Sequence, residues 1–346
     1  MSKEVHILVI RLSAMGDVAM TIPVLKAVVE QHPTIKITFI SKAFLKPLFD
    51  NITNVTFYAA DVTDKHKGVL GLHKLYKELQ LLNITHVADL HNVLRSKIVR
   101  SFFKSSGASI AVIDKGRAEK KALTRTKNKI FKQLRSSHDR YADVFKKLGF
   151  SVDITNPKKL KKPEILKSVL KVKKTKENKW IGIAPFAAFE AKMYPLDLMK
   201  EVIETLSQKH QVFLFGGGQK EIEILSEIET KTNNCTSVAG KLNLTKELNL
   251  IAHLDCMIAM DSGNAHFAAM QQIPTITIWG ATHPFAGFAP FNQPKENCLL
   301  PDLEKYPNIP CSIYGNKNCV GYEDVMRSIP SKSVIKKAEN ILKNNS

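Results

Sequence analysis

The stretch VHILVIRLSAMGD, residues 5–17, joins a short apolar run to a loop of mostly small residues that ends in an aspartate. The apolar run Val5–Ile10 predicts a buried strand, and Thr21–Gln31 predicts the helix that follows it. In such a strand–loop–helix unit the loop lies at the carboxyl edge of a parallel sheet, where backbone N–H groups can meet a ligand. The stretch therefore predicts an α/β fold with a candidate binding loop directly behind its first strand.

Short apolar runs continue to alternate with helical stretches, which indicates parallel strands joined by helices. The expected strands of the first half are Ile35–Ile40, Val55–Tyr58, His86–Asp89 and Ser109–Ile113, and its further helices are Gly71–Leu82 and Ser96–Phe103. After the lysine-rich stretch Pro157–Lys179 the pattern restarts with strands at Trp180–Ala184, Val212–Phe215, Cys256–Ala259 and Thr275–Trp279, and helices at Leu196–His210, Glu221–Thr230, Leu248–Ala252, Ala265–Gln271 and Ser331–Lys343.

This order of elements predicts two α/β domains with Rossmann-like parallel sheets, residues 1–176 and 177–330. The carboxyl ends of both sheets are expected to face a central cleft, because open α/β sheets bind ligands at that edge. A final helix in residues 331–346 could pack back on the first domain.

The formal net charge of +19 is unevenly distributed along the chain. Residues 1–176 contain 35 lysines and arginines against 14 acidic residues, whereas residues 177–346 contain 16 against 18. Such an asymmetry suggests an anionic partner for the first half: nucleic acid, a membrane surface or a multiply charged substrate. Lysines that only keep the surface soluble would produce the same count, so the charge alone leaves these alternatives open.

Several classes of protein are disfavoured by what the sequence lacks. The run Val5–Ile10 is too short for the core of a signal peptide, and no apolar run approaches about 18 residues, so we expect a cytoplasmic protein. Neither GxGxxG nor GxxxxGK[ST] occurs, which argues against a dehydrogenase and a P-loop NTPase. The five cysteines are expected to be reduced structural thiols, because Cys311 and Cys319 have neither CxxC spacing nor a nearby histidine pair.

Asp17 is the candidate functional carboxylate of the first loop. It could act as a general base, or it could cap a helix that begins near Val18. Gly16 before it would permit a positive φ and the close approach of a substrate. The residues alone leave both roles of Asp17 open.

Behind the strand Cys256–Ala259, the segment Asp261–His266 is expected to open a helix. Free N–H groups at such a helix start could hold a diphosphate, although loops of this composition also occur in proteins that bind no anion. His266 could bind a ligand or be a local hydrogen-bonding residue only. Lys192 is the one basic residue of the loop Pro185–Pro195, and it could neutralise a leaving phosphate or be ordinary surface charge.

Three glycines, Gly216–Gly218, follow another expected strand. Glycines at this place let a ligand approach the backbone, and an acidic residue on the next helix can take ribose hydroxyls. Glu221 and Glu223 are the candidates for that contact. A tight turn with a solvated acidic face behind it is the structural alternative.

Together these segments resemble the heptosyltransferase family, whose members add heptose to the lipopolysaccharide inner core from an ADP-linked donor. The resemblance covers nearly the whole chain, and its strongest part is the first loop. The residues that carry it are Ile7–Ile10, Arg11, Ser13, Met15–Asp17, Thr21–Pro23 and Leu25; Asp89–Asn92 with Leu94–Ser96; His138–Gly149; Lys192 with Pro195; Gly216–Glu221; Ala239–Lys241; Asp261–His266; and the run from Pro274 through Gly280 to Pro290.

The resemblance implies the two-domain glycosyltransferase architecture called GT-B, inversion of the anomeric centre, and chemistry without a metal or other cofactor. It implies that Asp17 is the catalytic base and that Glu221, or Glu223 in its place, binds the donor ribose. The residues implied to hold the donor diphosphate are Lys192, Asp261, Ser262, Gly263 and His266. The candidates for acceptor binding are Ser13, Gly16, Arg95, Arg117 and Lys120, together with Arg100 and Lys121.

The partners that follow from the resemblance are an ADP-sugar donor and an anionic glycolipid acceptor, with no nucleic acid. The protein would be cytoplasmic and peripheral to the inner membrane, where its basic half would meet the acidic glycolipid. No Asp-x-Asp pair occurs in the chain, which agrees with a site that needs no metal.

Two departures from the family pattern weaken the expected identity of the donor more than that of the fold. The segment Phe186–Phe189 replaces a glycine and hydroxyl residues ahead of Lys192, and Tyr194 stands where tryptophan is frequent. A transferase of the same fold with another nucleotide sugar is one alternative. A nucleic-acid-binding α/β protein is another, since Lys115–Arg135 holds nine basic residues and one acidic residue. A nucleotide-sugar-binding protein without catalysis is a third, and the intact Asp17 argues against it.

Overall fold

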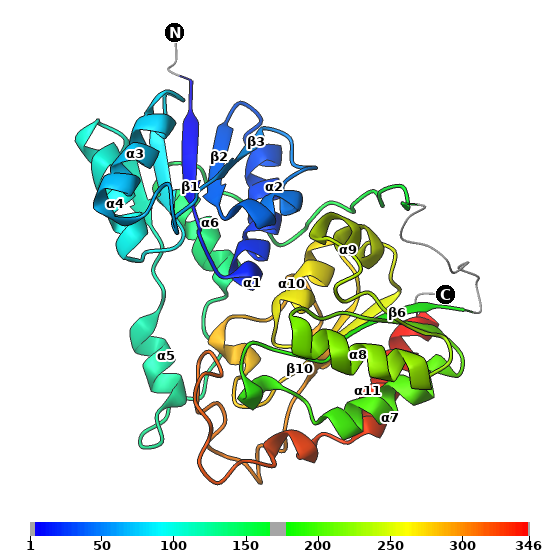
Figure 1. Cartoon of the computed structure of the whole chain (residues 1–346). Helices are drawn as coiled ribbons and strands as arrows, with labels where there is room; N and C mark the ends of the chain where they lie inside the picture. The colour runs from blue at the N-terminus through cyan, green and yellow to red at the C-terminus, as the bar shows by residue number, and fades with distance from the viewer. Residues whose placement is uncertain (1–3, 167–177, 345–346) are drawn as a thin grey trace. The chain divides into compact units, whose positions relative to one another are not determined.

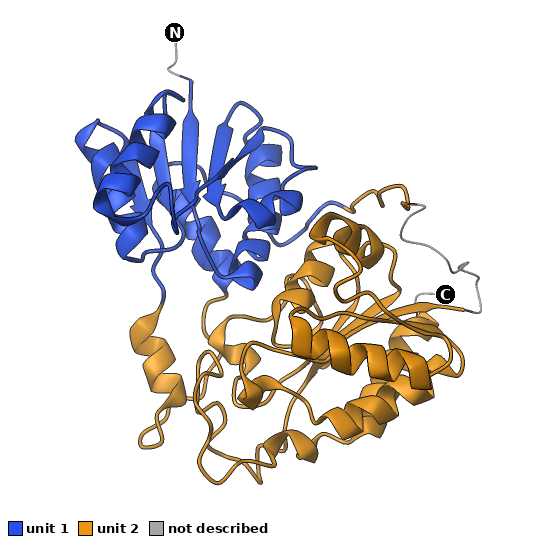
Figure 2. Cartoon of the chain, viewed as in Figure 1, with its two compact units in different colours: residues 1–115, 137–158 blue, residues 116–136, 159–346 orange. Residues whose placement is uncertain are grey.

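The computed structural model describes residues 4–166 and 178–344 of the chain. The chain divides into two compact units (Figure 2), of which unit 1 comprises Met1–Lys115 with Ser137–Lys158, and unit 2 comprises Gly116–Ser136 with Lys159–Ser346. Each unit is an α/β fold with a parallel sheet, as the sequence predicts. The expected domain boundary at residues 176 and 177 lies outside the described residues.

The sheet of unit 1 has five parallel strands in the order β3-β2-β1-β4-β5. This is the strand order of a Rossmann-like half in which the chain reverses its direction of travel between β1 and β4. The strands are β1 His6–Ile10, β2 Lys36–Ser41, β3 Val55–Ala59, β4 His86–Asp89 and β5 Ser109–Val112 (Figure 1). All five lie within a residue or two of their predicted positions.

Helices cover both faces of this sheet, so the central strand β1 is buried from Ile7 to Ile10. Leu8 and Ile10 of β1 pack with leucines of α3 and with Val99 and Phe103 of α4. Side chains alternate across a strand, so Ile7 and Val9 point to the opposite face. The helices of unit 1 are α1 Met15–Ala19, α2 Thr21–Gln31, α3 Gly68–Gln80, α4 Leu94–Ser105 and α6 Ser137–Lys147, with a 3₁₀ turn at Ala43–Leu48.

The sheet of unit 2 has six parallel strands in the order β11-β10-β9-β6-β7-β8. Counted from β6, this is the six-stranded Rossmann order, and the reversal falls between β6 and β9. The strands are β6 Trp180–Ala184, β7 Gln211–Leu214, β8 Cys235–Ser237, β9 Cys256–Met260, β10 Thr275–Ile278 and β11 Cys298–Leu299. The strands β8 and β11 were not predicted, because runs of three and two residues contain too few side chains to display a period.

The helices of unit 2 were predicted from their apolar spacing, and α7, α8, α10 and α11 are found at those positions, while α9 begins four residues earlier than expected. They are α7 Leu196–Ser207, α8 Gln219–Lys231, α9 Leu244–Ile251, α10 Gly263–Met270 and α11 Ser331–Asn344, with short 3₁₀ turns at Glu190–Lys192, Pro284–Ala286, Lys295–Asn297 and Val325–Ser328.

The final helix α11 packs on unit 2, where the sequence allowed for packing on the first domain. It contacts α7 and β9. Its buried residues Val334, Ala338 and Leu342 are spaced four apart and join the main hydrophobic core of unit 2. The helix α11 has one apolar face, and the core of unit 2 covers that face.

Residues 116–136 leave unit 1 after β5 and pack on unit 2, although they were expected to belong to the first domain. The segment contains the helix α5, Arg117–Thr124. Leu123 and Leu134 are buried against Ala286, and the backbone N–H of Leu134 donates to the carbonyl oxygen of Phe285 at 2.9 Å. Two isolated leucines carry no strand or helix period, so the sequence did not indicate where they pack.

This insertion also divides the basic charge between the units. Residues 116–136 hold eight lysines and arginines and one glutamate. Unit 1 therefore has 19 basic residues against 12 acidic ones, a smaller excess than the count over residues 1–176 suggested. The basic surface is a property of both units.

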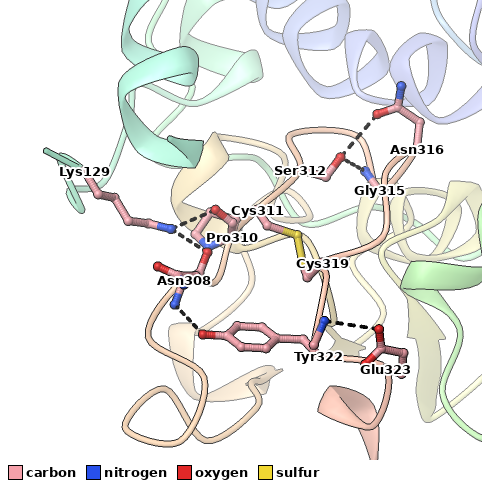
Figure 3. Close-up of a disulfide and its surroundings, with 11 residues drawn as sticks. Lys129, Asn308, Pro310, Cys311, Ser312, Gly315, Asn316, Cys319, Tyr322 and Glu323 are labelled. Atoms are coloured by element: carbon pink, nitrogen blue, oxygen red, sulfur yellow. Dashed lines mark hydrogen bonds between the residues drawn. A yellow bond between two sulfur atoms is a disulfide. The ribbon is translucent and has the colours of Figure 1, made fainter. Parts of the chain in front are cut away.

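One expectation about the cysteines was wrong. Cys311 and Cys319 form a disulfide, with their Cα atoms 5.7 Å apart (Figure 3). Cys235, Cys256 and Cys298 are free thiols. Burial raises the pKa of Cys235 and Cys256 to about 12 and that of Cys298 to about 11, so these three thiols stay protonated.

Among residues 4–166 and 178–344, no helix combines the length and the apolar character needed to cross a bilayer.

The packing of residues 116–136 on unit 2 can be tested with Leu134→Ala. Removal of a buried leucine typically costs about 2–5 kcal/mol, and we expect this loss to appear in unit 2, although the residue lies between two elements of unit 1 in sequence. Hydrogen exchange should accelerate around residues 283–288 and remain unchanged in β1–β5. The control is Ile130→Ala in the same segment, where the side chain is 46% exposed. Faster exchange in β5 and α6 instead would contradict the assignment.

Candidate functional site

Each unit carries a cluster of polar side chains where its strand order reverses. In unit 1 the adjacent strands β1 and β4 end side by side, with Ile10 paired to Asp89. In unit 2 the adjacent strands β6 and β9 end side by side, with Ala184 paired to Ala259. The loops that follow such neighbouring strands leave in opposite directions and open a crevice between them, which is where open α/β sheets bind ligands.

In unit 1, the loop after β1 is organised by an ion pair between Arg11 and Asp17. Arg11 also donates from Nη1 to the carbonyl oxygen of Leu90 at 2.8 Å, which connects the loop after β1 to the loop after β4. Asp17 Oδ2 accepts the backbone N–H of Ala14 at 3.3 Å. The Asp17 side chain remains 28% exposed, so a substrate can reach it.

Two details of this loop differ from the sequence expectation. The helix begins at Met15, so Asp17 is its third residue and reaches back to Ala14, whereas it was considered as the cap of a helix near Val18. Gly16 has a helical backbone within α1, so the positive φ expected there is not used. The capping contact and the ion pair use the same carboxylate oxygen.

A second network holds the loop after β4. Asp89 is fully buried, and its Oδ1 accepts the backbone N–H groups of His91 at 2.9 Å and Asn92 at 2.7 Å. Its Oδ2 pairs with Arg100 at 2.6 Å. Breaking a buried ion pair by removing one partner is strongly destabilising, so Asp89 fixes the shape of this loop. Arg100, a candidate for acceptor binding, therefore already has a structural partner.

His91 connects the two loops of unit 1. Its Nδ1 accepts the backbone N–H of Leu12 at 3.3 Å, and its Nε2 lies 3.5 Å from the hydroxyl of Ser13. Burial, together with the positive charges of Arg11 and Lys115, lowers the pKa of His91 to about 4. The ring is thus neutral at physiological pH and can accept a hydrogen bond.

In unit 2, Lys192 and Asp261 form the centre of the corresponding cluster. Lys192 lies at the end of the 3₁₀ turn that follows β6, and its Nζ is 2.9 Å from Oδ2 of Asp261 behind β9. The hydroxyl of Thr282 donates to the same oxygen at 3.0 Å. The two charged side chains are only 13% and 8% exposed, and each provides the other with an opposite charge at close range.

The start of α10 lies directly behind this pair. Ser262 is the N-cap residue, and Gly263 and Asn264 are the first helical residues, whose backbone N–H groups have no partner within the helix. The buried Ser262 hydroxyl has no hydrogen-bond partner among the described residues. His266 is buried one turn further on. An ammonium group and a helix start that lie together can bind an anion.

The glycine loop after β7 lies in the same unit. Gly218 has a φ of 88° and precedes α8. Oε2 of Glu221 accepts the backbone N–H of Gly217 at 2.7 Å, so this carboxylate lies at the loop. Glu223 is exposed and pairs with Gln219 within the helix at 2.8 Å. Of the two glutamates considered for ribose binding, Glu221 is the one placed at the glycines.

The other predicted acceptor residues do not form one group within a unit. Ser13, Gly16 and Arg95 belong to unit 1, and Arg95 is exposed on α4. Arg117 and Lys120 belong to α5 of unit 2. Arg117 is exposed, whereas Lys120 is 8% exposed and its Nζ lies 4.2 Å from the centre of the Phe288 ring. Their assignment to acceptor binding stays a prediction.

Thr282 was not proposed as a site residue from the sequence, and His91 was named only within the stretch Asp89–Asn92, although both follow a strand at its carboxyl end. Asp17 and Asp261 were chosen because polar residues behind the carboxyl end of a parallel strand are candidates for a binding site. The same criterion, applied to every strand, would have included Thr282 and His91. Gly315 also contacts Lys192, and nothing in the sequence indicated it, because the contact joins positions that are 123 residues apart. In the described part of the chain, no group of three or more His, Cys, Asp or Glu residues is arranged to hold a metal ion.

Two Rossmann-like units of five and six parallel strands make up the GT-B architecture, and solved heptosyltransferases share this fold. The sequence model of glycosyltransferase family 9 (heptosyltransferase) matches residues 72–313, and the chain belongs to this family. The fold class and the family resemblance predicted from the sequence are confirmed, and the protein is a glycosyltransferase.

Relatives cover nearly the whole chain. Lipooligosaccharide heptosyltransferase 2 of Campylobacter jejuni is 24% identical over 95% of this chain and 96% of its own length. The lipopolysaccharide core heptosyltransferase OpsX of Haemophilus influenzae is 27% identical over 82% and 81%. Among solved structures, the family 9 glycosyltransferase of Veillonella parvula has a TM-score of 0.76 at 19% identity, with 99% and 98% of the chains covered. Escherichia coli WaaC has a TM-score of 0.67 at 18% identity, with 97% and 99% covered.

The neutral state of His91 predicts a defined pH dependence of stability. An unfolded histidine binds a proton near pH 6.5, whereas native His91 does so only near pH 4. Between these values the unfolded state binds more protons, so the free energy of unfolding falls as the pH falls from 6.5 to 4. His91→Gln should make this decline shallower when urea unfolding is measured at several pH values. His73→Gln, an exposed position, is the matched control, and an unchanged slope in His91→Gln would refute the assignment.

Proposed function

We propose that the protein is an inverting heptosyltransferase that moves heptose from ADP-heptose to the inner core of lipopolysaccharide. The observation that carries the proposal is the match to lipooligosaccharide heptosyltransferase 2 over 95% of this chain and 96% of that protein's length. The donor, the stereochemistry and the acceptor are the aspects of the proposal that go beyond membership of the family.

The donor is assigned to unit 2. A diphosphate needs a cation and N–H donors, and Lys192 lies beside the start of α10 with both. An ammonium group has three donors, so Lys192 can keep its contact with Asp261 and still bind a phosphate oxygen. WaaC of Escherichia coli has been solved with ADP and with ADP-2-deoxy-2-fluoro heptose, which supports an adenine nucleotide.

Glu221 is assigned to the ribose of the donor. Its carboxylate lies at the glycine loop after β7, where one of its oxygens already accepts the N–H of Gly217. The other oxygen can accept from a ribose hydroxyl, which is the usual role of an acidic residue behind such a loop.

Asp17 is assigned as the general base. It removes the proton from an acceptor hydroxyl, whose oxygen bonds to the anomeric carbon while the bond from that carbon to the diphosphate oxygen breaks. The configuration inverts because the new bond forms opposite the old one. Oδ2 of Asp17 is used by Arg11 and Ala14, so Oδ1 is the oxygen that would receive the proton.

Departure of ADP places negative charge on the diphosphate. Lys192 and the N–H groups of Gly263 and Asn264 would stabilise this charge, and such preorganised donors typically contribute about 10²–10³-fold to the rate. The segment Phe186–Phe189 offers no hydroxyls for further phosphate contacts. A nucleotide sugar other than ADP-heptose therefore remains the competing assignment for the donor.

The acceptor is assigned as an anionic glycolipid, and the protein as cytoplasmic and peripheral to the membrane. Arg95 on unit 1 and the basic residues 116–136 on unit 2 supply exposed positive charge for such a partner. A single-stranded nucleic acid would need aromatic side chains for stacking. Phe131, the one aromatic residue of that segment, instead packs against the rings of His283 and Phe285, each at 5.0 Å, which favours the glycolipid.

The role of Asp17 is tested by Asp17→Asn, which keeps the size and the capping geometry of the side chain. Loss of a general base should lower kcat by about 10²–10⁴-fold, with the nucleotide affinity of unit 2 unchanged. Asp50→Asn, an exposed carboxylate of the same unit, should retain full activity. If Asp17→Asn turns over at the wild-type rate, another group accepts the proton.

The donor base is tested by thermal shifts with ADP, UDP and GDP at matched concentrations. A ligand that binds the native state stabilises it by RT ln(1 + [L]/Kd), about 2.7 kcal/mol at 100 times Kd. We expect the largest shift with ADP, and we expect Lys192→Met to reduce it while Lys209→Met, an exposed lysine of the same unit, does not. A larger shift with UDP would assign a different donor and leave the transferase proposal intact.

A further inference from the structure

Lys192 is held in place by more than its ion pair with Asp261. A lysine has a flexible stem of four carbons, and ordering it costs up to about 2 kcal/mol of rotamer freedom. Gly315 forms the wall on which this stem lies, since a Cβ atom at Gly315 would overlap Cγ and Cδ of Lys192. Gly315 is buried and has a φ of 74°, a conformation that glycine adopts without strain.

Gly315 belongs to a short loop that the disulfide closes, residues 311–319, here called the Cys311–Cys319 loop. Within the loop, the hydroxyl of Ser312 accepts the backbone N–H of Gly315 at 3.0 Å and lies 3.2 Å from Oδ1 of Asn316 (Figure 3). Of the seven residues between the cysteines, only Ser312 and Gly315 are buried. The loop thus has almost no apolar core of its own, and its shape depends on the cross-link, a few hydrogen bonds and the packing of Ile313 on the cluster around Ala286.

The loop is joined to the segment that carries Lys192. The carbonyl oxygen of Ala281 accepts the N–H groups of Cys311 and Ser312 at 3.2 and 3.3 Å, and the N–H of Ala281 donates to the carbonyl oxygen of Ala191 at 3.0 Å. Ala191 immediately precedes Lys192. The loop therefore contacts the stem of Lys192 through Gly315 and is hydrogen-bonded, through Ala281, to the backbone next to Lys192.

The chain before the disulfide is fixed by a second lysine. Nζ of Lys129 donates to the carbonyl oxygens of Asn308 and Pro310 at 2.7 and 2.8 Å (Figure 3). The N–H of Asn308 donates to the hydroxyl of Tyr322 at 3.2 Å, which ties the segment before Cys311 to the segment after Cys319. Both ends of the loop therefore have fixed attachments, and the disulfide closes the ring between them.

We propose that the Cys311–Cys319 loop is a positioning device for Lys192, in which Gly315 holds the lysine stem in the phosphate-binding pose and the closed disulfide increases the affinity for the donor nucleotide. This inference rests on the proposed binding of a nucleoside diphosphate at Lys192. Reduction opens the loop: the two sulfurs take up two electrons and two protons from a dithiol, which is itself oxidised to a disulfide. The stem of Lys192 then loses its wall, and fewer molecules present the ammonium group to the diphosphate.

The disulfide borders a cavity on the side of Cys319. Cys319 lines a cavity of about 440 Å³ whose other walls include Ala191, Ala281 and Tyr322. The cavity therefore meets both the cross-link and the segment next to Lys192. A small dithiol such as dithiothreitol fits a space of this volume.

The first measurement is the Kd of ADP with and without dithiothreitol, by calorimetry on the full chain. Partial loss of a charge-assisted contact should weaken ADP binding by about three- to tenfold on reduction. The double variant Cys311→Ser with Cys319→Ser should bind as weakly as the reduced protein and should not respond to dithiothreitol. Cys298→Ser, which removes a thiol outside the loop, should keep the full response. Equal Kd values in all of these states would overturn the proposal.

The second measurement needs no nucleotide: the rate at which an amine-reactive acylating reagent labels Lys192, followed by peptide mass spectrometry. Reduction, the double serine variant and Gly315→Ala should each accelerate labelling of Lys192, whereas Lys241, which is paired with Glu229 at 2.6 Å outside the loop, should be labelled at a constant rate. Faster labelling in a protein that binds no ADP would retain the positioning role and reject the ADP donor. Unchanged labelling alongside normal ADP binding would reject the positioning role and retain the donor.

Discussion

A parallel sheet in which the strand order reverses separates the two loops that follow the strands on either side of the reversal, and both units of this protein place a cluster of polar residues there. The reversal lies between β1 and β4 in unit 1 and between β6 and β9 in unit 2. The proposed function depends on this constraint, because it brings Asp17 near His91 and Lys192 near Asp261 although each pair is more than 60 residues apart in sequence. The position of these residues at the carboxyl ends of neighbouring strands is what brings them together.

In both units, the buried carboxylate near the crevice forms an ion pair with a basic side chain. Asp89 is fully buried and pairs with Arg100, and the nearly buried Asp261 pairs with Lys192. A charge taken out of water requires a partner, and the pairing leaves the ionised groups in fixed orientations. The difference lies in access: the Asp89 pair shapes a loop from within, whereas the Lys192 ammonium lies beside the open start of α10. The same electrostatic requirement thus gives a structural pair in one unit and a candidate binding pair in the other.

The sequence predicted those regions of the protein that repeat a pattern. Strands such as His86–Asp89 and helices such as α7 follow from apolar periodicity, and Asp17, Lys192 and Asp261 follow from their positions behind strands. The strand β8, the packing of residues 116–136 and the pairing of Cys311 with Cys319 were missed, because each depends on contacts between distant positions and leaves no local period. Gly315 is the extreme case, since its only signal is the absence of a side chain where a distant lysine needs space.

The packing of residues 116–136 on unit 2 has a consequence for folding during synthesis on the ribosome. The α6 helix follows at Ser137 and finds its partners α2, β4 and β5 already synthesised, so unit 1 can close while the inserted segment is left outside it. Leu123 and Leu134 can pack only when Phe285 and Ala286 have been synthesised, about 150 residues later. At roughly 5–20 residues per second this takes about eight to thirty seconds. During that time residues 116–136 lie outside the folded unit 1 with their two leucines unburied. Their eight basic residues favour solubility until the rest of unit 2 has been synthesised.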